Sequence, residues 1–291
     1  MANGVFLSDR GVIEVAGADA TAFLHKLITN SVLNIPAGES RYSGLLTPQG
    51  KLMFDFFVVP LPEGAEAGYY FDCPRAQAAD LAKRVNFHKM RAKITVTDKS
   101  DALGVAAFWG GEVAPDVEGL AYRDMRAPDM GFRVIGAPDK LASLGTQNAA
   151  AYEAHRVAEG VPKGGVDFTY GDTFVHDVNL DFLHGVDFKK GCYVGQEVVA
   201  RVHFRNSARK RIVKVHFNGP APEQGAQLIA GEIAIGQIGS TAGSEGLASL
   251  RLDKLEDAKA AGTEVKVGGV PVEVDVPPEF IATAAGVEKR L

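Results

Sequence analysis

The chain has 291 residues and a formal net charge of −5, with 46% hydrophobic and 23% charged residues. This composition is globular and excludes a disordered chain, a collagen and a disulfide-stapled small domain. The acidic balance disfavours a globally basic nucleic-acid binder, although it is compatible with a local basic patch. The two cysteines, Cys73 and Cys192, are too few and too far apart for a disulfide framework, and they favour a reducing, cytoplasmic setting.

The first residues, MANGVFLSDRG, lack a basic segment followed by an apolar one, so we expect no signal peptide. No apolar run approaches the roughly 20 residues that a membrane helix needs. We therefore expect a soluble protein with no membrane partner.

The first half of the chain alternates strand-like and helix-like segments, which predicts mixed α and β structure. The expected elements are a strand over 11–15, a helix capped by Asp19, strands over 52–59 and 69–71, a helix from Pro74 to about 85, and a strand over 92–97.

A helix is predicted over about 147–159, where Gly160 and Pro162 provide the stop signals. From about residue 207 the pattern changes to short alternating strands separated by glycine-rich turns. The segments 265–267 and 270–272 form a hairpin signal across Gly268 and Gly269. We therefore expect a boundary near 207 and a closed or nearly closed β domain over 207–291.

The segment 189–197, KKGCYVGQE, is the densest in chemical groups. Two glycines shape a loop around Cys192 that leads into a short helix, and two lysines precede it. Lysine ammonium groups and a helix N-terminus lower the pKa of a thiol, which predicts a reactive Cys192. A buried, inert cysteine is about equally compatible with the pattern. Gln196 has both a donor and an acceptor for an amide-like ligand edge.

Residues 189–214 carry eight basic side chains against one acid, Glu197, so this strip is a candidate for binding a carboxylate, a phosphate or RNA. A solvated surface gives the same pattern. Asp55, inside an apolar strand, and Asp177, in a polar loop, are candidate ligand-facing acids. We expect no metal site and no standard dinucleotide, Walker or GxSxG site, because their spacings are missing.

The octapeptide KGCYVGQE (190–197) resembles the signature of the YgfZ-type folate-binding proteins. These are relatives of the glycine-cleavage T-protein, an aminomethyltransferase, and of a mitochondrial iron–sulfur assembly factor. The segments 47–51, 152–162 and 179–181 resemble further parts of that family. The resemblance implies an α+β fold with two interwoven α+β domains and a C-terminal β-barrel. The implied region 1–206 divides into about 1–44 with 140–206, and 45–139.

The resemblance also implies a tetrahydrofolate pocket and a role in making or repairing iron–sulfur proteins, including tRNA-modifying enzymes. It assigns Cys192 and Lys190 to the chemistry, with Cys192 as an iron ligand or a nucleophile. The implied folate contacts are Asp55, Asp72, Asp177, Tyr193, Gln196 and Arg201. Asp177 stands where the T-protein has a glutamate, and Val175 stands where a proline is usual.

A folate-dependent accessory factor that works with iron–sulfur client or assembly proteins is therefore the leading hypothesis, and whether it catalyses a reaction is open. An aminomethyltransferase acting with a lipoyl carrier protein is the first alternative. An RNA-binding module that uses the 189–214 strip is the second, although a nucleic-acid partner is not expected.

Overall fold

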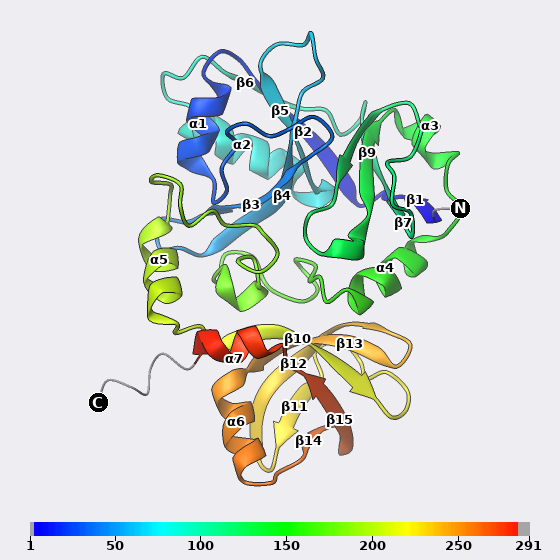
Figure 1. Ribbon diagram of the computed structural model, residues 1–291, viewed down its shortest axis with the longest axis vertical. Helices are drawn as coiled ribbons and strands as arrows, with labels where there is room; N and C mark the ends of the chain where they lie inside the picture. Colours follow the sequence, from blue (N-terminus) through cyan, green and yellow to red (C-terminus); the bar gives the residue numbers. More distant parts are fainter. Residues whose placement is uncertain (1–2, 285–291) are drawn as a thin grey trace. The chain divides into compact units, whose positions relative to one another are not determined.

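The computed structural model describes residues 3–284, and the chain divides into two compact units. In Figure 1, the strands coloured blue to green belong to unit 1, and the barrel coloured yellow to red belongs to unit 2. Unit 1 comprises Met1–Thr47, Met53–Tyr152 and Phe182–Val194, and unit 2 comprises Pro48–Leu52, Glu153–Asp181 and Gly195–Leu291.

Unit 1 contains a five-stranded sheet with the strand order β3-β4-β5-β2-β6. Two helices, α1 (Ala20–Leu27) and α2 (Ala78–His88), pack their apolar faces on it, and Leu24 and Leu81 are completely buried there. Burial of these faces holds the layers together, because each buried leucine contributes about 1.5–3 kcal/mol. The strands are β2 (Arg10–Ala16), β3 (Arg41–Leu46), β4 (Leu52–Pro60), β5 (Gly68–Pro74) and β6 (Thr95–Asp98).

The second sheet of unit 1 has the order β1-β7-β9-β8. Helix α3 (Pro138–Ala142) packs on it through Leu141, which joins Phe108 and Val134 in a small core. The strands are β1 (Asn3–Phe6), β7 (Gly104–Trp109), β8 (Leu120–Arg123) and β9 (Phe132–Gly136). Because the consecutive strands β1 and β2 lie in different sheets, the chain interweaves them, and the expected interwoven α+β fold is confirmed.

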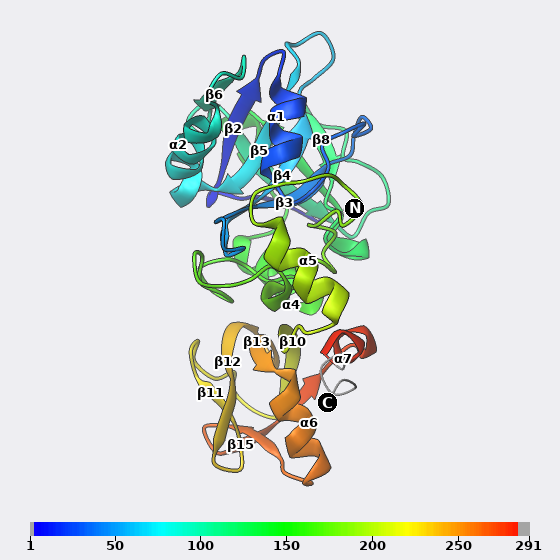
Figure 2. The same ribbon diagram turned by 90° about the vertical axis from the view of Figure 1, so that its left-hand side faces the viewer.

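Unit 2 contains a closed barrel with the order β10-β13-β12-β11-β14-β15, in which β15 pairs with β10 to close the ring (Figure 2). The expected C-terminal barrel is thus confirmed. Its strands are β10 (Lys210–Phe217), β11 (Gln227–Ala230), β12 (Ile233–Ala242), β13 (Glu245–Arg251), β14 (Val265–Val267) and β15 (Val270–Asp275). The other helices of the chain are α4 (Ala149–Ala158), α5 (Gln196–Arg205), α6 (Leu252–Ala260) and α7 (Pro278–Ala284), with 3-10 turns η1 (Arg75–Gln77), η2 (Pro128–Met130) and η3 (His176–Val178).

Most predicted elements are present, with three corrections at their ends. Asp19 stands at the start of α1 but makes no side-chain cap, because its carboxylate accepts a hydrogen bond from the main-chain N–H of Lys93 (2.7 Å). Pro74 does not begin a helix: its backbone is extended, so β5 runs through it, and α2 begins only at Ala78, after η1. The predicted strand over 92–97 begins later, at Thr95. Gly160 follows α4 with a φ of 69°, the left-handed conformation that glycine adopts at helix ends. The domain boundaries drawn from the sequence stay predictions.

No helix within residues 3–284 is long and apolar enough to cross a membrane.

Candidate functional site

The signature loop in unit 1 begins with a tight turn around Asp187. The Asp187 carboxylate accepts hydrogen bonds from the main-chain N–H groups of Lys189 (2.8 Å) and Lys190 (3.2 Å). Its own N–H donates to the main-chain oxygen of Thr29 (3.1 Å). An aspartate that bonds to the backbone two and three residues ahead is a turn former, so this acid fixes the entry into the loop.

Lys190 points into the protein. Its ammonium donates to the main-chain oxygens of Ile28 (2.7 Å) and Asn30 (2.8 Å) and lies 5.2 Å from the centre of the Tyr193 ring. Burial lowers the pKa of Lys190 to about 8, although Asp187 opposes the shift. In this structure Lys190 therefore holds the loop to the end of α1, and a direct role in chemistry stays a prediction.

Cys192 is exposed, whereas Cys73 is buried. The alternative of a buried, inert Cys192 is therefore wrong, and Cys192 is accessible to a partner. The thiol lies in a shallow hollow of about 440 Å³ with the imidazole of His25 from α1. Burial and the Lys190 charge lower the pKa of His25, which favours the neutral ring. The hollow is lined by His25, Lys26, Gly191, Cys192, Tyr193 and Val194.

Two polar residues after α1 support this hollow, and sequence reasoning did not assign them a role. The Thr29 hydroxyl donates to the main-chain oxygen of Gly185 (2.7 Å). The Asn30 side chain donates to the main-chain oxygens of Tyr42 (2.8 Å) and His184 (2.6 Å). They therefore tie the segment before the signature to β3. A polar Thr-Asn pair directly after an apolar helical face was the available signal.

Asp55 lies on β4 and is buried, as its apolar neighbours in the sequence predict. One carboxylate oxygen accepts a hydrogen bond from the Tyr42 hydroxyl (2.6 Å). Burial and Asp55 together raise the pKa of Tyr42 well above its usual range, so this tyrosine is a neutral donor. The Arg126 guanidinium stacks over the rings of Tyr42 (5.5 Å) and Phe57 (4.9 Å). A buried carboxylate in such a frame is oriented to accept N–H donors.

Asp72, on β5, is completely enclosed by the protein's own side chains. It forms ion pairs with Arg10 (2.6 Å) and Arg133 (2.6 Å), and it accepts a hydrogen bond from the Tyr122 hydroxyl (2.7 Å). Burial alone raises the pKa of Asp72, but the two arginines outweigh it and lower the pKa below the ordinary value. This geometry joins the two sheets of unit 1. As a folate contact, Asp72 stays a prediction that the geometry does not favour.

The remaining predicted residues divide between the units. Tyr193 is a buried residue of unit 1, and burial raises its pKa. Asp177, Gln196 and Arg201 belong to unit 2. Asp177 is half-buried in η3 and accepts a hydrogen bond from the main-chain N–H of Phe174 (3.2 Å), and burial raises its pKa. Gln196 is the first residue of α5 and half-buried, whereas Arg201 is exposed.

Two motifs that lie far apart in the sequence meet within unit 2. Gly195, with a φ of 80°, caps α5. Gly50, in the turn that opens β4, has a φ of 81°, and a Cβ there would lie 2.9 Å from the Cβ of Val198 on α5. Glycine at this position lets the turn pack against the first turn of α5.

The basic strip over 189–214 is not a continuous cationic surface. Lys190 is buried, and Arg211 is completely buried. The Arg211 guanidinium forms two hydrogen bonds with the Asp181 carboxylate (2.6 and 2.9 Å) and a third with the main-chain oxygen of His176 (2.7 Å). The strip therefore offers fewer free cations to RNA than its sequence indicates.

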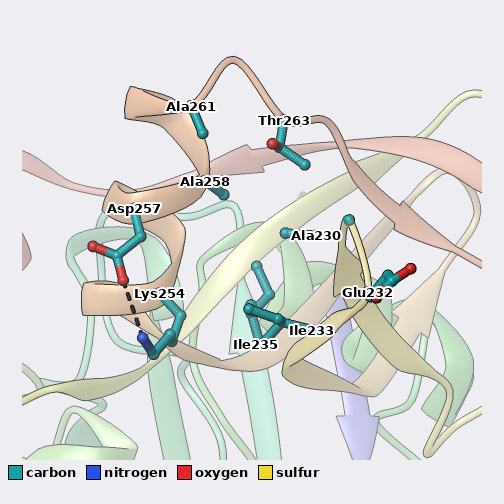
Figure 3. A pocket seen from close by; sticks show the side chains of 10 residues that line it. Ala230, Glu232, Ile233, Ile235, Lys254, Asp257, Ala258, Ala261 and Thr263 are labelled. Atoms are coloured by element: carbon teal, nitrogen blue, oxygen red, sulfur yellow. Dashed lines mark hydrogen bonds and ion pairs between the residues drawn. The ribbon is translucent and has the colours of Figure 1, made fainter.

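A second hollow, of about 360 Å³, lies in the barrel between α6 and the β11–β12 turn (Figure 3). Its walls are mainly methyl groups of alanine and isoleucine, with the Lys254–Asp257 ion pair (3.0 Å) at one side. None of the site residues predicted from the sequence lines it. In the part of the chain that the structure describes, no three histidine, cysteine or acidic side chains are grouped as a metal site.

Comparison with known families and folds agrees with this architecture. Residues 4–137 match the model of the GCVT N-terminal domain, and residues 209–280 match that of the CAF17 C-terminal beta-barrel domain. The crystal structure of glycine cleavage system aminomethyltransferase T from Bartonella henselae superposes with a TM-score of 0.74, covering 95% of this chain and 86% of that chain. At 19% identity, this similarity shows the fold alone.

Sequence similarity decides the family. The chain is 32% identical to the mitochondrial iron–sulfur cluster assembly factor IBA57 of Mus musculus, covering 86% of this chain and 78% of the relative. The chain belongs to the IBA57 family. The homolog from Coccidioides immitis is 35% identical, and the one from Mycosarcoma maydis is 33% identical. The IBA57-family chain spans 57% and 55% of the length of these two fungal relatives.

These relatives confirm the expected relation to iron–sulfur assembly factors, and they carry the IBA57 name rather than that of the related YgfZ-type proteins. The expectation of a cytoplasmic setting is wrong. The fungal and mammalian IBA57 relatives are named as mitochondrial proteins. A low cysteine count is common to every reducing compartment, so it could not distinguish between them.

Proposed function

We propose that this protein assists the assembly of iron–sulfur clusters on client proteins. Its membership of the IBA57 family carries the proposal, because the mouse and fungal relatives are named as iron–sulfur cluster assembly factors. The relatives' names point to the mitochondrion as the compartment of this activity. Aminomethyl transfer lacks comparable support, because the similarity to the T-protein structure shows the fold alone. RNA binding lacks it because Lys190 and Arg211 of the basic strip are buried.

Cys192 is the residue of this chain that we assign to the cluster or its precursor. Its sulfur is exposed in a hollow, on a loop held by Lys190 and Asp187. A thiolate in this position has access to iron as a ligand, or to an electrophilic one-carbon unit as a nucleophile. Both roles need accessible sulfur on a fixed loop, and the buried Cys73 lacks that access.

The test is complementation of cells that lack the gene, with the activity of cluster-dependent enzymes as the readout. Cys192→Ala is expected to lose complementation while the protein accumulates normally, and the matched control Cys73→Ala is expected to retain it. Full complementation by Cys192→Ala would remove the thiol from the function. Cluster-dependent tRNA modifications, measured in the same cells, test whether tRNA-modifying enzymes are among the clients.

Tetrahydrofolate is the second part of the proposal, and the chemistry of Asp55 supports it. A pterin presents N–H donors, and Asp55 is a buried carboxylate oriented by the Tyr42 hydroxyl. We assign Asp55 to the pterin, and we keep Asp177, Tyr193, Gln196 and Arg201 as further proposed contacts. Asp72 does not fit, because Arg10, Arg133 and Tyr122 enclose it. Bound tetrahydrofolate would supply a carrier for one-carbon groups.

Anaerobic calorimetric titration with tetrahydrofolate tests this part separately. Asp55→Asn is expected to weaken binding by about tenfold to a hundredfold, since a hydrogen bond to a charged group contributes about 1.5–3 kcal/mol. Binding that is unchanged in Asp55→Asn would exclude the assigned position. An absence of binding in the wild-type protein would exclude the cofactor but leave the assembly role standing.

A further inference from the structure

The C-terminal end of α2 in unit 1 carries a surface that neither the fold nor the proposed function explains. The buried face of α2 ends at Val85, and beyond it Phe87 is 74% exposed and Met90 is 91% exposed. Figure 2 shows this helix at the outer edge of its unit, beside β6. Large apolar side chains that stay in contact with water forgo the free energy of burial, and two of them three residues apart at one helix end are a candidate interaction site.

The sequence around these two side chains is strongly basic. Two acids border it: Asp80 pairs with Lys83, and the Asp19 carboxylate accepts a hydrogen bond from the main-chain N–H of Lys93 (2.7 Å). The stretch 81–97 contains five cations and no acid, although the chain as a whole carries −5. Within residues 3–284, only Lys83 of these cations forms an ion pair, with Asp80 (3.3 Å). We define the α2-end patch by its two apolar and four unpaired cationic residues, Arg84, Phe87, Lys89, Met90, Arg91 and Lys93.

The backbone at Met90 gives an independent observation. Its φ of 45° lies in the left-handed region, which glycine adopts without cost and which a long side chain rarely occupies. The chain thus places a strained methionine at a helix end where glycine would relieve the strain. The side chain is almost fully exposed, so no internal packing compensates for that strain.

We propose that the α2-end patch docks this protein on an anionic lipid bilayer. Lys and Arg side chains near an anionic surface attract its headgroups, and a protruding Phe–Met pair has the chemistry to enter the headgroup–acyl boundary. A protein partner fits less well, because ordinary protein interfaces bury about 800 Å² on each side around a broad apolar centre. Two apolar and four cationic side chains form a smaller and more basic surface than such an interface. The proposal departs from our expectation of no membrane partner, which rested on the lack of a long apolar run, because surface docking needs no membrane-spanning helix.

Co-sedimentation of the full chain with vesicles tests the proposal. Vesicles of phosphatidylcholine containing about one-third phosphatidylglycerol are expected to bind the protein at low salt, and pure phosphatidylcholine vesicles are not. Binding is expected to weaken as ionic strength rises from about 0.05 to about 0.5 M, because the Debye length shortens to a few ångströms. No binding to anionic vesicles at low salt, or equal binding to neutral ones, would overturn the proposal.

Two variants then locate the contact. Replacing Arg84, Lys89 and Arg91 by Gln is expected to lower the partition coefficient about a hundredfold, at about fivefold for each cation. Phe87→Ser with Met90→Ser is expected to lower it at least about tenfold, because a buried Phe alone contributes that much. Both variants are expected to keep the wild-type melting temperature, since the altered side chains are largely exposed.

The matched control neutralises three barrel lysines, Lys254, Lys259 and Lys266, and is expected to leave vesicle binding within a factor of two. An equal loss in this control would show a net-charge effect and overturn the assignment to α2. The proposal would also be overturned if the protein bound soluble RNA tightly instead of vesicles and if Phe87→Ser with Met90→Ser left that RNA binding unchanged. That result would identify a polyanion site.

Discussion

Asp124 is predicted to be a carboxylate on which the stability of unit 1 depends strongly. It is buried between two guanidinium groups, with Arg126 Nη2 at 2.7 Å and Arg133 Nε at 3.0 Å from Oδ2. Arg126 also donates its Nε to Oδ1 (2.9 Å). Asp124→Asn keeps the shape but replaces one acceptor by an amide that points its own donors at guanidinium N–H groups. Removing one member of a buried ion pair costs about 3–5 kcal/mol, which is the loss we expect at neutral pH.

Part of this loss has a defined pH dependence. Burial alone raises the pKa of Asp124, but Arg126 and Arg133 outweigh it and lower the pKa from 3.8 to about 2. A depressed folded-state pKa contributes stability that is complete above the unfolded-state value and disappears as the pH falls through the folded-state value. The shift corresponds to about 2 kcal/mol, so the difference between wild type and Asp124→Asn should narrow by that amount from about pH 4 to about pH 2.

Urea unfolding followed by tryptophan fluorescence measures this effect in unit 1. Trp109, the single tryptophan of the chain, is buried on β7 beside the Tyr152 ring (5.6 Å between centroids). Asp116→Asn, which removes the same charge from an exposed loop of the same unit, is the control and should change stability by less than about 0.5 kcal/mol. A loss below about 1 kcal/mol for Asp124→Asn, or a loss independent of pH, would refute the reasoning.

Three further outcomes are expected. Burial lowers the folded-state pKa of Lys190 to about 8, so between about pH 8 and pH 10 the lysine is protonated in the unfolded chain but neutral in the folded one. The free energy of unfolding of the wild type should therefore rise with pH in this range, and Lys190→Met should abolish the rise. A rise that persists in the variant would contradict this. Arg211→Met should lower the stability of unit 2 by about 3–5 kcal/mol in circular-dichroism melts, because it leaves the Asp181 carboxylate without its partner. Arg211→Lys should not restore this stability, because a lysine cannot form the bidentate contact. A change in stability within experimental error would contradict this prediction. A thiol reagent should label Cys192 in the native protein and Cys73 only after unfolding, because burial raises the pKa of Cys73 to about 12; native labelling of both would exclude this assignment.

The sequence predicted those elements whose signals are local. The apolar run of β4, the glycine stop after α4 and the alternating strands of the barrel each depend on neighbouring residues, and each is present. The four-stranded sheet was not predicted beyond general strand–helix alternation. Its strands β7, β8 and β9 are only four to six residues long. β9 pairs with both β7 and β8, and the segments that connect these strands carry no hairpin signal.

The candidate site shows the same division between local and distant information. The loop around Cys192 and the short helix after it follow from two glycines that are close in sequence, whereas the exposure of Cys192 was left open and comes from the structure. The enclosure of Asp72 does not follow from the local sequence either, because its partner Arg133 lies 61 residues away and nothing local distinguishes this acid from Asp55. Both are buried acids on neighbouring strands of one sheet. Only the three-dimensional placement of arginines separates an enclosed carboxylate from one held by a tyrosine.

The lysine and the cysteine of the signature have separate tasks in this structure, although they are two residues apart. Lys190 anchors the loop by donating hydrogen bonds to two main-chain oxygens. Because even the neutral amine has two N–H donors, this anchoring role is compatible with the lowered pKa of Lys190. The loop it holds then leaves Cys192 exposed in the hollow that His25 also lines. If this division holds, Lys190→Met should reduce function by moving the loop, and the rate of native thiol labelling at Cys192 should change with it. A direct chemical role for the lysine would instead abolish function and leave the labelling rate as in the wild type.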